Sequence, residues 1–360
     1  MKKKALIAMS GGVDSSVAAY LMKEQGYDCI GATMKLYDND DVGISRTATC
    51  CSAEDVDDAR SVAFTLGMPY YVFNFTEAFK EEVIGRFIQA YEQGRTPNPC
   101  IECNRYLKFE KFYRRMLEMG YDTVVTGHYV RIREDEGGRF HLYRALDLSK
   151  DQSYVLYSLT QEQLSHAKFP LGELTKDAVR EIAEAQGFIN AKKHESQDIC
   201  FVQNGSYADF IEQYTGKTYA PGPFIGSDGN VAGAHKGIIR YTIGQRKGLG
   251  LAFGEPVYVT EVDPVANTVR LGHNEDLFTT TLEADEVNLI PFDHLPGPMR
   301  VQASIRYQAP PRPATVTETP EGQLRLVFDT PQRAITLGQA VVLYDGDEVL
   351  GGGTICKKEV

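Results

Sequence analysis

The stretch Ser10-Gly11-Gly12-Val13-Asp14-Ser15 lies between a short apolar run, residues 5–9, and a segment with helical spacing, residues 15–25. Two successive glycines let the backbone turn sharply and approach an anion closely. The following helix would direct its unpaired N–H groups and the positive end of its dipole at the turn. Ser10 and Ser15 add hydroxyl donors, and Asp14 could fix the loop or help to place Mg²⁺. The stretch therefore predicts an anion-binding loop between a first strand and a first helix.

The loop lacks the spacing and the lysine of G-x-x-x-x-G-K-[ST], and it does not match G-x-G-x-x-G. An ordinary strand–helix turn with a Ser or Asp cap is the alternative reading. The position at the first βα turn, where open sheets bind ligands, favours a nucleotide site.

Strands and helices alternate through the first third of the chain. We expect strands at residues 5–9, 29–34, 70–73 and 123–126, and helices at 15–25, 53–66, 76–91 and 106–119. This alternation predicts an α/β fold with a doubly wound parallel sheet. Residues 131–146 alternate around Gly137-Gly138 and predict a β-hairpin, and residues 175–186 predict a further helix.

The second half of the chain is richer in Gly and Pro. From about residue 285 it becomes a series of short strands, at 301–306, 324–328, 340–344 and 349–355, which predicts a small β-barrel. We expect three domains: an α/β domain at 1–204, a small central domain at 205–284 and a C-terminal β-barrel at 285–360.

Composition supports a multidomain globular protein. The chain has 360 residues, 42% hydrophobic and 24% charged. Its formal net charge of −11 disfavours non-specific binding to nucleic acid or anionic membrane. The apolar run at residues 5–9 is too short for a signal peptide, and no stretch approaches the roughly 20 apolar residues that span a bilayer. We expect a cytoplasmic location.

The chain contains seven cysteines, an odd number, which argues for chemistry or metal binding rather than a disulfide framework.

Several strings resemble known proteins. The loop resembles the SGGxDS signature of the ATP pyrophosphatase (PP-loop) superfamily, whose members cleave ATP to AMP and pyrophosphate and adenylate a substrate oxygen. The chain from about residue 5 to about residue 355 resembles the bacterial tRNA-specific 2-thiouridylase family. The strings that carry this resemblance are residues 98–104 (NPCIECN), 126–129 (TGHY), 150–154 (KDQSY), 198–201 (DICF) and 241–249 (YTIGQRKGL), with Arg306-Tyr307.

The resemblance implies a reaction and a set of site residues. ATP would adenylate O2 of the wobble uridine of tRNA, and a cysteine persulfide would then deliver sulfur to C2 and release AMP. Cys200 is similar to the persulfide carrier and Cys103 to the nucleophile that forms a disulfide with it. An upstream donor, a cysteine desulfurase or a sulfur relay protein, would load the sulfur. The implied ATP contacts are Ala8, Met9, Ser10, Gly11, Gly12, Val13, Asp14, Ser15, Met34 and Gly127. The implied tRNA contacts are Asn98, Pro99, Cys100, His128, Lys150, Asp151, Gln152, Arg306, Tyr307 and Gln339.

The cysteines leave two routes open. Cys103 is expected just before the helix at 106–119, where a helix N-terminus favours a thiolate. The family often has an acidic residue where this chain has Cys100. Cys100, Cys103 and Cys200 together could hold an iron–sulfur cluster; we favour the persulfide route. Cys29 and Cys356 are interpreted as small buried hydrophobes, and Cys50 and Cys51 receive no role.

A basic stretch could hold tRNA on this acidic chain. No acidic residue lies between Asp228 and Glu255, whereas His235, Lys236, Arg240, Arg246 and Lys247 all do. A solvated charged surface is the ordinary explanation of such a stretch. Arg300, Arg306, Arg312 and Arg325 add charge further on, so we expect a local basic face that contacts tRNA by shape and phosphates.

Two other functions fit the loop alone: an ATP-dependent ligase or amidotransferase acting on a small molecule, and a nucleotide sensor or sulfur-trafficking adaptor without turnover. The first of these leaves the cysteine trio and the C-terminal barrel unexplained.

Overall fold

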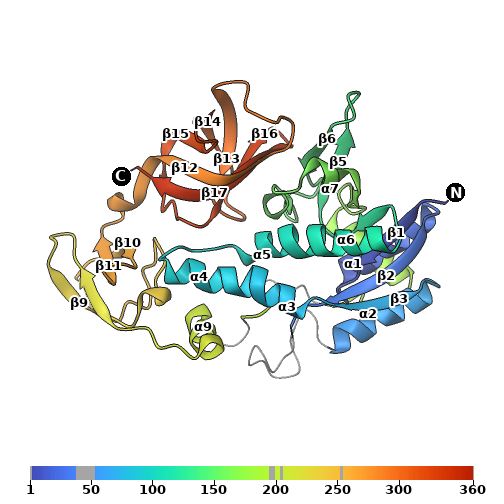
Figure 1. The fold of residues 1–360 in the computed structure, drawn as a ribbon, viewed down its shortest axis with the longest axis horizontal. Helices are drawn as coiled ribbons and strands as arrows, with labels where there is room; N and C mark the ends of the chain where they lie inside the picture. The colour runs from blue at the N-terminus through green and yellow to red at the C-terminus, as the bar shows by residue number, and fades with distance from the viewer. Residues whose placement is uncertain (1, 38–52, 194–198, 203–205, 252–253, 360) are drawn as a thin grey trace. The chain divides into compact units, whose positions relative to one another are not determined.

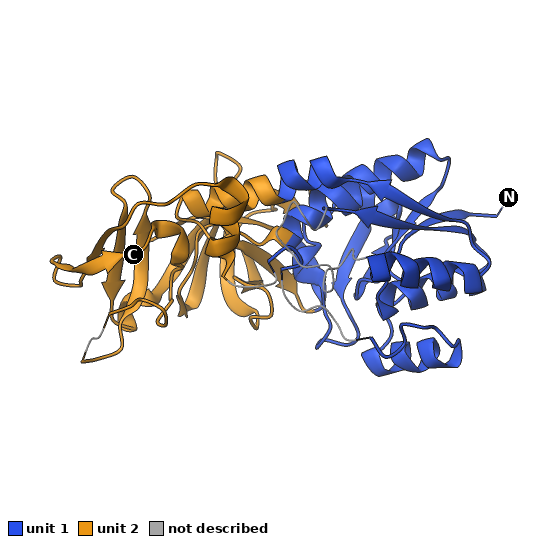
Figure 2. Ribbon diagram, turned by 90° about the horizontal axis from the view of Figure 1, so that it is seen from below, with its two compact units in different colours: residues 1–83, 100–204, 347–350 blue, residues 84–99, 205–346, 351–360 orange. Residues whose placement is uncertain are grey.

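The computed structural model describes residues 2–37, 53–193, 199–202, 206–251 and 254–359 (Figure 1). Cys50 and Cys51 lie outside these ranges. The chain forms two compact units, which Figure 2 distinguishes by colour. Unit 1 comprises residues 1–83, 100–204 and 347–350, and unit 2 comprises residues 84–99, 205–346 and 351–360. None of the helices in the described ranges has the length and apolarity needed to cross a membrane.

Unit 1 is built on a five-stranded parallel sheet in the order β3-β2-β1-β4-β7. The strands are β1 (Lys4–Ala8), β2 (Asp28–Lys35), β3 (Tyr70–Asn74), β4 (Thr123–Val125) and β7 (Ala167–Lys168). The chain moves outward from β1 to β3 and then returns to β4 on the other side of β1. The sheet therefore has a topological switch point between β1 and β4, where open α/β sheets bind ligands. The predicted doubly wound parallel sheet is confirmed.

Helices α1 (Val13–Glu24) and α2 (Ala53–Thr65) pack on the sheet of unit 1, and α8 (Lys176–Ala185) packs on α1. Helix α1 buries most of its surface against β1, β2 and α8. The core of unit 1 is made largely of small and branched apolar side chains, among them Ala5, Ile7, Met9, Val17, Ala18, Met22, Val125 and Val179. Small residues on α1 bring its backbone close to the sheet, and this closeness fixes the loop between β1 and α1.

Two long helical runs contain π-helical segments. The first consists of α3 (Thr76–Phe79), a π-helical stretch (Lys80–Gly85) and α4 (Arg86–Glu92). The second consists of α5 (Pro99–Glu102), a π-helical stretch (Cys103–Lys111) and α6 (Phe112–Glu118). The sequence prediction that this helix begins at Tyr106 was wrong, because it begins at Pro99. Proline suits the first helical position, where its missing N–H has no intrahelical acceptor.

A β-hairpin extends from unit 1, as predicted, with strands β5 (Val130–Glu134) and β6 (Phe140–Arg144). Glu348 and Val349, the first residues of β17, pair with Tyr143 and Leu142 of β6. His141 Nδ1 lies 2.5 Å from Glu348 Oε1, and its Nε2 lies 3.2 Å from Asp135 Oδ2. One imidazole thus joins the hairpin turn to the strand that pairs with it. Unit 1 also contains helix α7 (Gln161–Ser165), which the sequence analysis missed.

Unit 2 contains helix α9 (Tyr207–Thr215) and two sheets. The smaller has the order β10-β11-β8-β9, formed by β8 (Gly222–Ile225), β9 (Val231–His235), β10 (Tyr258–Asp263) and β11 (Thr268–Gly272). The larger is a six-stranded barrel, closed because β12 pairs with both β15 and β17. Its strands are β12 (Phe278–Leu289), β13 (Met299–Ser304), β14 (Arg312–Glu318), β15 (Leu324–Arg333), β16 (Ala340–Asp345) and β17 (Glu348–Lys358). The predicted C-terminal barrel is confirmed.

The contacts of His141 predict that the hairpin weakens as pH rises. Burial lowers the pKa of His141, but hydrogen bonds and charges from Glu348 and Asp135 outweigh burial and raise it above its ordinary value. A raised folded-state pKa adds stability that is complete below the unfolded pKa of about 6.5 and is lost as pH rises through the folded pKa. We expect the free-energy difference between wild type and His141→Gln to shrink between mildly acidic and alkaline pH. An NMR titration of His141 with a midpoint at or below 6.5 would contradict this.

Candidate functional site

The predicted phosphate loop connects β1 to α1 at the switch point of the sheet. Gly12 occupies the N-cap position of α1 with φ −88° and ψ 161°. The hydroxyl groups of Ser15 and Ser16 donate to the Gly12 carbonyl at 3.0 and 3.1 Å, and the Ser10 amide donates to Ser15 Oγ at 3.2 Å. Glycine has no side chain to cap the helix, so the N–H groups of the first turn remain available to an anion.

Gly11 packs directly against the backbone of α2. Its φ is +74°, and a Cβ at this position would lie 2.3 Å from the carbonyl oxygen of Asp55. The Gly11 carbonyl accepts hydrogen bonds from Asn190 Nδ2 at 2.9 Å and from Lys193 Nζ at 3.4 Å. Because a trans peptide points its C=O and N–H in opposite directions, these bonds turn the Gly12 N–H away from Asn190. Glycine is therefore required at position 11 for both conformation and space.

Lys193 ties the loop to α2 by charge. Its ammonium lies 2.6 Å from Asp55 Oδ1 and 2.6 Å from Asp58 Oδ2. Burial lowers the pKa of Lys193, but the hydrogen bonds and charges of the two carboxylates outweigh it and raise the pKa. Asn190, which is 2% exposed, also donates to Ser16 Oγ at 2.9 Å. Residues 190–193 therefore brace the phosphate loop from a part of the chain that contains no recognisable motif.

Asp14 has two donors on one oxygen. Lys176 Nζ lies 2.7 Å from Asp14 Oδ1, and the Tyr129 hydroxyl donates to the same atom at 2.8 Å. Lys176 and Tyr129 are both buried, whereas the side chain of Asp14 is 30% exposed. The sequence analysis left open whether Asp14 fixes the loop or helps to place Mg²⁺. The structure gives it an ion pair within the protein.

Met34 and Gly127 lie at the same edge of the sheet as the loop. Met34 is two residues beyond Ala32, which pairs with Ala8 at the end of β1. A Cβ on Gly127 would lie 2.8 Å from the carbonyl carbon of Asp14 and from the amide nitrogen of Ser15. The predicted ATP-contacting residues are thus gathered around the phosphate loop, although their contacts with ATP remain a prediction.

His128 is buried just beyond the end of β4. Its Nδ1 lies 2.7 Å from Thr126 Oγ1, and its Nε2 lies 3.4 Å from Lys108 Nζ. Burial, followed by the charge of Lys108, lowers the pKa of His128 well below its ordinary value, so the ring is neutral. Lys108 connects this edge of the sheet to the helical run that carries Cys103. The predicted contact between His128 and tRNA would require this side chain, which is 8% exposed, to reach substrate.

Cys100 and Cys103 lie on one helical run that begins at Pro99, so Cys103 does not precede the helix as predicted. Cys100 is in the first turn and exposed, and Cys103 is one turn further and partly buried. Residues three apart on a helix share a face, with Cβ atoms about 5–6 Å apart. The helix N-terminus therefore favours a thiolate at Cys100 more directly than at Cys103.

Cys200 is partly buried and is held through its backbone. Its carbonyl accepts a hydrogen bond from the Tyr37 hydroxyl at 2.8 Å, and Tyr37 lies just beyond the end of β2. The neighbouring Phe201 is buried, with its ring centroid 5.6 Å from that of Phe79. These contacts fix the main chain at Cys200 near the carboxyl ends of the central strands. Cys29, by contrast, is a buried core residue whose pKa is raised by burial to about 11.

The three cysteines do not form a preassembled metal site. Over the described ranges of the chain, no group of three or more His, Cys, Asp or Glu side chains is placed to hold a metal ion. The described geometry thus does not fit a cluster held by Cys100, Cys103 and Cys200.

The residues predicted to contact tRNA already make contacts within their own units. In unit 1, Asp151 accepts bonds from the Ala145 amide and the Ser153 hydroxyl, and Gln152 Oε1 accepts from the Tyr129 amide. In unit 2, Gln339 Nε2 donates to the carbonyls of Thr96 and Pro97, and Arg306 donates to those of Arg333 and Ala334. Gln339 therefore holds the segment that leads to Asn98. Tyr307 is 41% exposed. Whether these residues contact tRNA stays a prediction.

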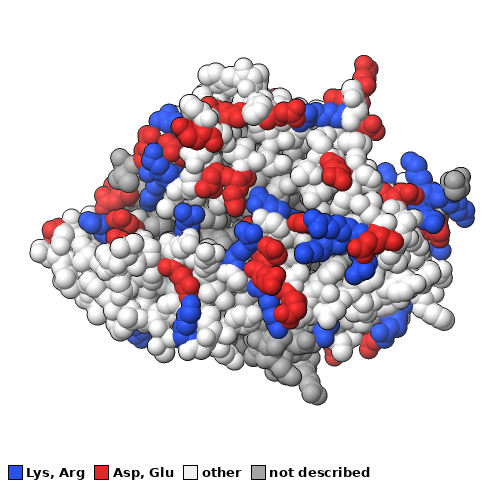
Figure 3. Space-filling model, in the orientation of Figure 1, with Lys and Arg blue, Asp and Glu red and all other residues white. Residues whose placement is uncertain are grey.

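The predicted basic stretch is smaller than its sequence suggests. His235 is buried, and Arg240 is paired with Asp209 and Glu212 at 2.8 and 2.6 Å. Lys236, Arg246 and Lys247 are exposed. Arg300 and Arg325 are paired with Asp329 and Glu359. Figure 3 likewise shows positive and negative side chains interspersed on the visible face.

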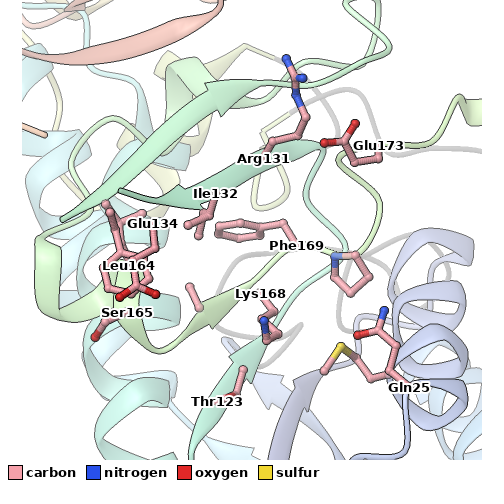
Figure 4. A pocket seen from close by; sticks show the side chains of 14 residues that line it. Gln25, Thr123, Arg131, Ile132, Glu134, Leu164, Ser165, Lys168, Phe169 and Glu173 are labelled. Carbon is pink, nitrogen blue, oxygen red and sulfur yellow. The ribbon is translucent and has the colours of Figure 1, made fainter. Parts of the chain in front are cut away.

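A separate pocket of about 410 Å³ lies in unit 1 beside β4 and β7 (Figure 4). Phe169, Ile132 and Leu164 line it, together with Lys168, Glu134 and Glu173. None of the predicted ATP, thiol or tRNA residues belongs to its lining, so its size does not make it the reaction site.

Models of known protein families match the chain from residue 3 to residue 355, with short gaps between them. Three family models match in succession: "tRNA methyl transferase HUP domain" at residues 3–204, "tRNA methyl transferase PRC-barrel domain" at 208–273 and "Aminomethyltransferase beta-barrel domain" at 279–355.

Curated relatives match over nearly their full length. The chain is 53% identical over 358 residues to the tRNA-specific 2-thiouridylase MnmA of Clostridioides difficile (strain 630), covering 99% of each chain. It is 50% identical to that of Lachnoclostridium phytofermentans, covering 99% of this chain and 100% of the relative. A 4-thiouridine synthetase–RNA complex with bound ATP shows a much weaker likeness: 20% identity, a TM-score of 0.38, and coverage of 59% of this chain and 50% of that one.

The packing of the loop predicts different outcomes for its two glycines. Gly11→Ala places Cβ against the Asp55 carbonyl and requires a non-glycine residue at φ +74°, so we expect lower thermal stability and loss of ATP-dependent activity. A side chain larger than that of alanine at position 11 would clash with the α2 backbone even more, so it would disrupt the fold as well as the activity. Gly12→Ala is the matched control, because its φ is −88° and its Cβ would lie 3.5 Å from Ser10 Oγ. Equal melting temperatures for the two variants would contradict this account.

Proposed function

The chain belongs to the tRNA-specific 2-thiouridylase family, and we propose that it replaces O2 of the wobble uridine of tRNA by sulfur in an ATP-dependent reaction. The observation that supports the proposal is that unit 1 contains both the phosphate loop and the segments that bear Cys100, Cys103 and Cys200. Uridine C2 is a poor electrophile with a poor leaving group, so activation by ATP has to precede the attack of sulfur.

The first half-reaction uses the loop. O2 of the uridine attacks the α-phosphorus of ATP, and the bond to the β-phosphate breaks to release pyrophosphate. The N–H groups of the first turn of α1 bind phosphate oxygens, and the braced Gly11 peptide keeps the loop in shape. Mg²⁺ would enter with the triphosphate, since it is usually bound by phosphate oxygens and one or two carboxylates. Asp14 is the carboxylate of the segment Ser10–Ser15, and its Oδ1 already accepts hydrogen bonds from Lys176 and Tyr129.

The second half-reaction uses two thiols. The terminal sulfur of a Cys200 persulfide attacks C2, and the bond between C2 and the adenylated oxygen breaks to release AMP. The Cys103 thiolate then attacks the Cys200 sulfur, so that the sulfur–sulfur bond breaks, the new sulfur stays on C2 and a Cys103–Cys200 disulfide forms. A dithiol reductant regenerates the thiols. A cysteine desulfurase or a sulfur relay protein reloads Cys200, and we propose that all of this occurs in the cytoplasm.

Unit 2 supplies candidates for holding tRNA. Lys236, Arg246 and Lys247 are exposed and lie in a stretch without acidic residues. Asn98 and Pro99 would face the target base, and Gln339 would fix the segment before them. We retain the division into domains 1–204, 205–284 and 285–360, with the central domain and the barrel acting on tRNA.

The thiol mechanism predicts that the two half-reactions can be separated. Cys200→Ser should stop thiolation and AMP release and still permit tRNA-dependent pyrophosphate release with formation of adenylated tRNA, because adenylation uses the loop and not the thiol. Thiolated tRNA is detected as a retarded band on a mercury-containing gel. Cys29→Ala is the matched control, since Cys29 is a buried core residue. Thiolation by Cys200→Ser at a rate comparable to wild type would exclude Cys200 as the sulfur carrier.

A second experiment distinguishes the persulfide route from the cluster route. After anaerobic purification, the protein is analysed for iron, sulfide and zinc, and Cys100→Ala is assayed in parallel. A metal-free protein that thiolates tRNA from a persulfide donor supports the persulfide route. Near-stoichiometric iron and sulfide, together with inactivity of Cys100→Ala, would replace it by a cluster.

The exposed basic stretch predicts a change in the salt dependence of tRNA binding. Replacing Lys236, Arg246 and Lys247 by alanine should flatten the plot of log K against log salt by roughly 0.7–0.9 units for each lost phosphate contact. Arg270→Ala is the control, because Arg270 is exposed in the same unit but paired with Glu261 at 3.1 Å. An unchanged slope in the triple variant would show that the stretch is only a solvated surface.

A further inference from the structure

The position of Lys176 is energetically unfavourable for a positive charge. The residue is 7% exposed, and burial of a charge without a partner is strongly unfavourable. It is also the first residue of α8, and the positive end of the helix dipole disfavours a cation there. Thr175 already caps the helix by accepting a hydrogen bond from the Ala178 amide, so the lysine side chain is not needed for capping. A buried cation at a helix N-terminus therefore needs a compensating partner.

That partner is Asp14 of the phosphate loop. The two charged atoms are 2.7 Å apart, and the residues are 162 positions apart in the sequence. The Tyr129 hydroxyl donates to the same carboxylate oxygen, and Lys176 Nζ lies 5.8 Å from the centre of the Tyr129 ring. The Tyr129 backbone is held in turn by Gln152, through bonds of 3.0 and 3.1 Å. Asp14 is thus fixed from α8 and from the segment after β4.

The loop needs this cation because of its own charge. The segment Ser10–Ser15 contains a carboxylate and no lysine or arginine, so on its own it would present a negative group to a triphosphate. Lys193, which bonds to the Gly11 carbonyl of the loop, is held between the carboxylates of Asp55 and Asp58. Lys176 is therefore the described cation that is directly bonded to the loop carboxylate.

We propose that Lys176 is a positioning residue of the ATP site, which neutralises Asp14 and fixes its carboxylate so that the phosphate loop accepts a triphosphate. The inference rests on the proposed function to the extent that the loop binds ATP. In this proposal Lys176 affects ATP binding indirectly, through Asp14. A lysine that contacts the phosphates would affect it directly.

The test is binding of α,β-methylene-ATP, which cannot be cleaved between the α- and β-phosphates, measured by calorimetry without Mg²⁺. Lys176→Met keeps the length of the side chain and removes its charge, and it should weaken binding by roughly tenfold or more, because charges a few ångströms apart interact strongly near a protein surface. Lys176→Arg should restore most of the affinity. Lys168→Met is the matched control, since Lys168 is an exposed lysine of the same unit.

A double-variant cycle distinguishes the two roles of a lysine. In the Asp14→Asn background, Lys176→Met should change the affinity by less than about threefold, because the charge that it neutralises has been removed. An equal loss in both backgrounds would mean that Lys176 acts on the nucleotide itself, by contact or through its charge, and not through Asp14. No loss in either background would mean that it has no role in binding. Both results overturn the proposal. Thermal melting of each variant verifies folding. Failure of the wild-type protein to bind the analogue would instead contradict the proposed function.

Discussion

The close approach of Gly11 to the backbone of α2 is the constraint on which the candidate site depends. A Cβ there would lie 2.3 Å from the Asp55 carbonyl oxygen, and Gly127 is almost as tightly packed against Asp14 and Ser15. The loop is thus enclosed by backbone on two sides and cannot widen or collapse without moving α2 or the end of β4. A rigid loop of this kind holds its N–H groups in place before an anion arrives, which lowers the entropy lost on binding.

Local sequence patterns were sufficient to predict strands β1 to β4 of the unit 1 sheet, but not β7 or all of the surrounding helices. Apolar runs placed β1 and β2 within a residue of their observed bounds, because a buried parallel strand is recognisable from its own residues. The start of the helix at Pro99 was missed, although Asn98-Pro99 is a typical helix start; the pair had been assigned to base contact instead. Helix α7 and the two-residue strand β7 are too short for a periodic signal.

The residues that support the loop could not have been found from the sequence. Asn190, Lys193 and Lys176 belong to no motif, and they reach the loop only because α8 packs on α1. The structure also removes two residues of the basic stretch from the expected tRNA-binding surface. His235 and Arg240 lie in the basic stretch, but one is buried and the other is paired with two carboxylates. A sequence shows which charges exist, whereas only the fold shows which of them are already neutralised.

This acidic chain is proposed to bind two polyanions, the triphosphate of ATP and the tRNA backbone, and each needs a different kind of binding site. A triphosphate enters a narrow loop, where backbone N–H groups and a helix dipole supply positive potential without any mobile side chain. The carboxylate in that loop is then tolerable only if a fixed cation offsets it, as Lys176 does. A tRNA backbone is long and must be followed over its length, which suits exposed lysine and arginine on a glycine-rich segment. Net charge therefore says little about either site, because each depends on charges within a few ångströms.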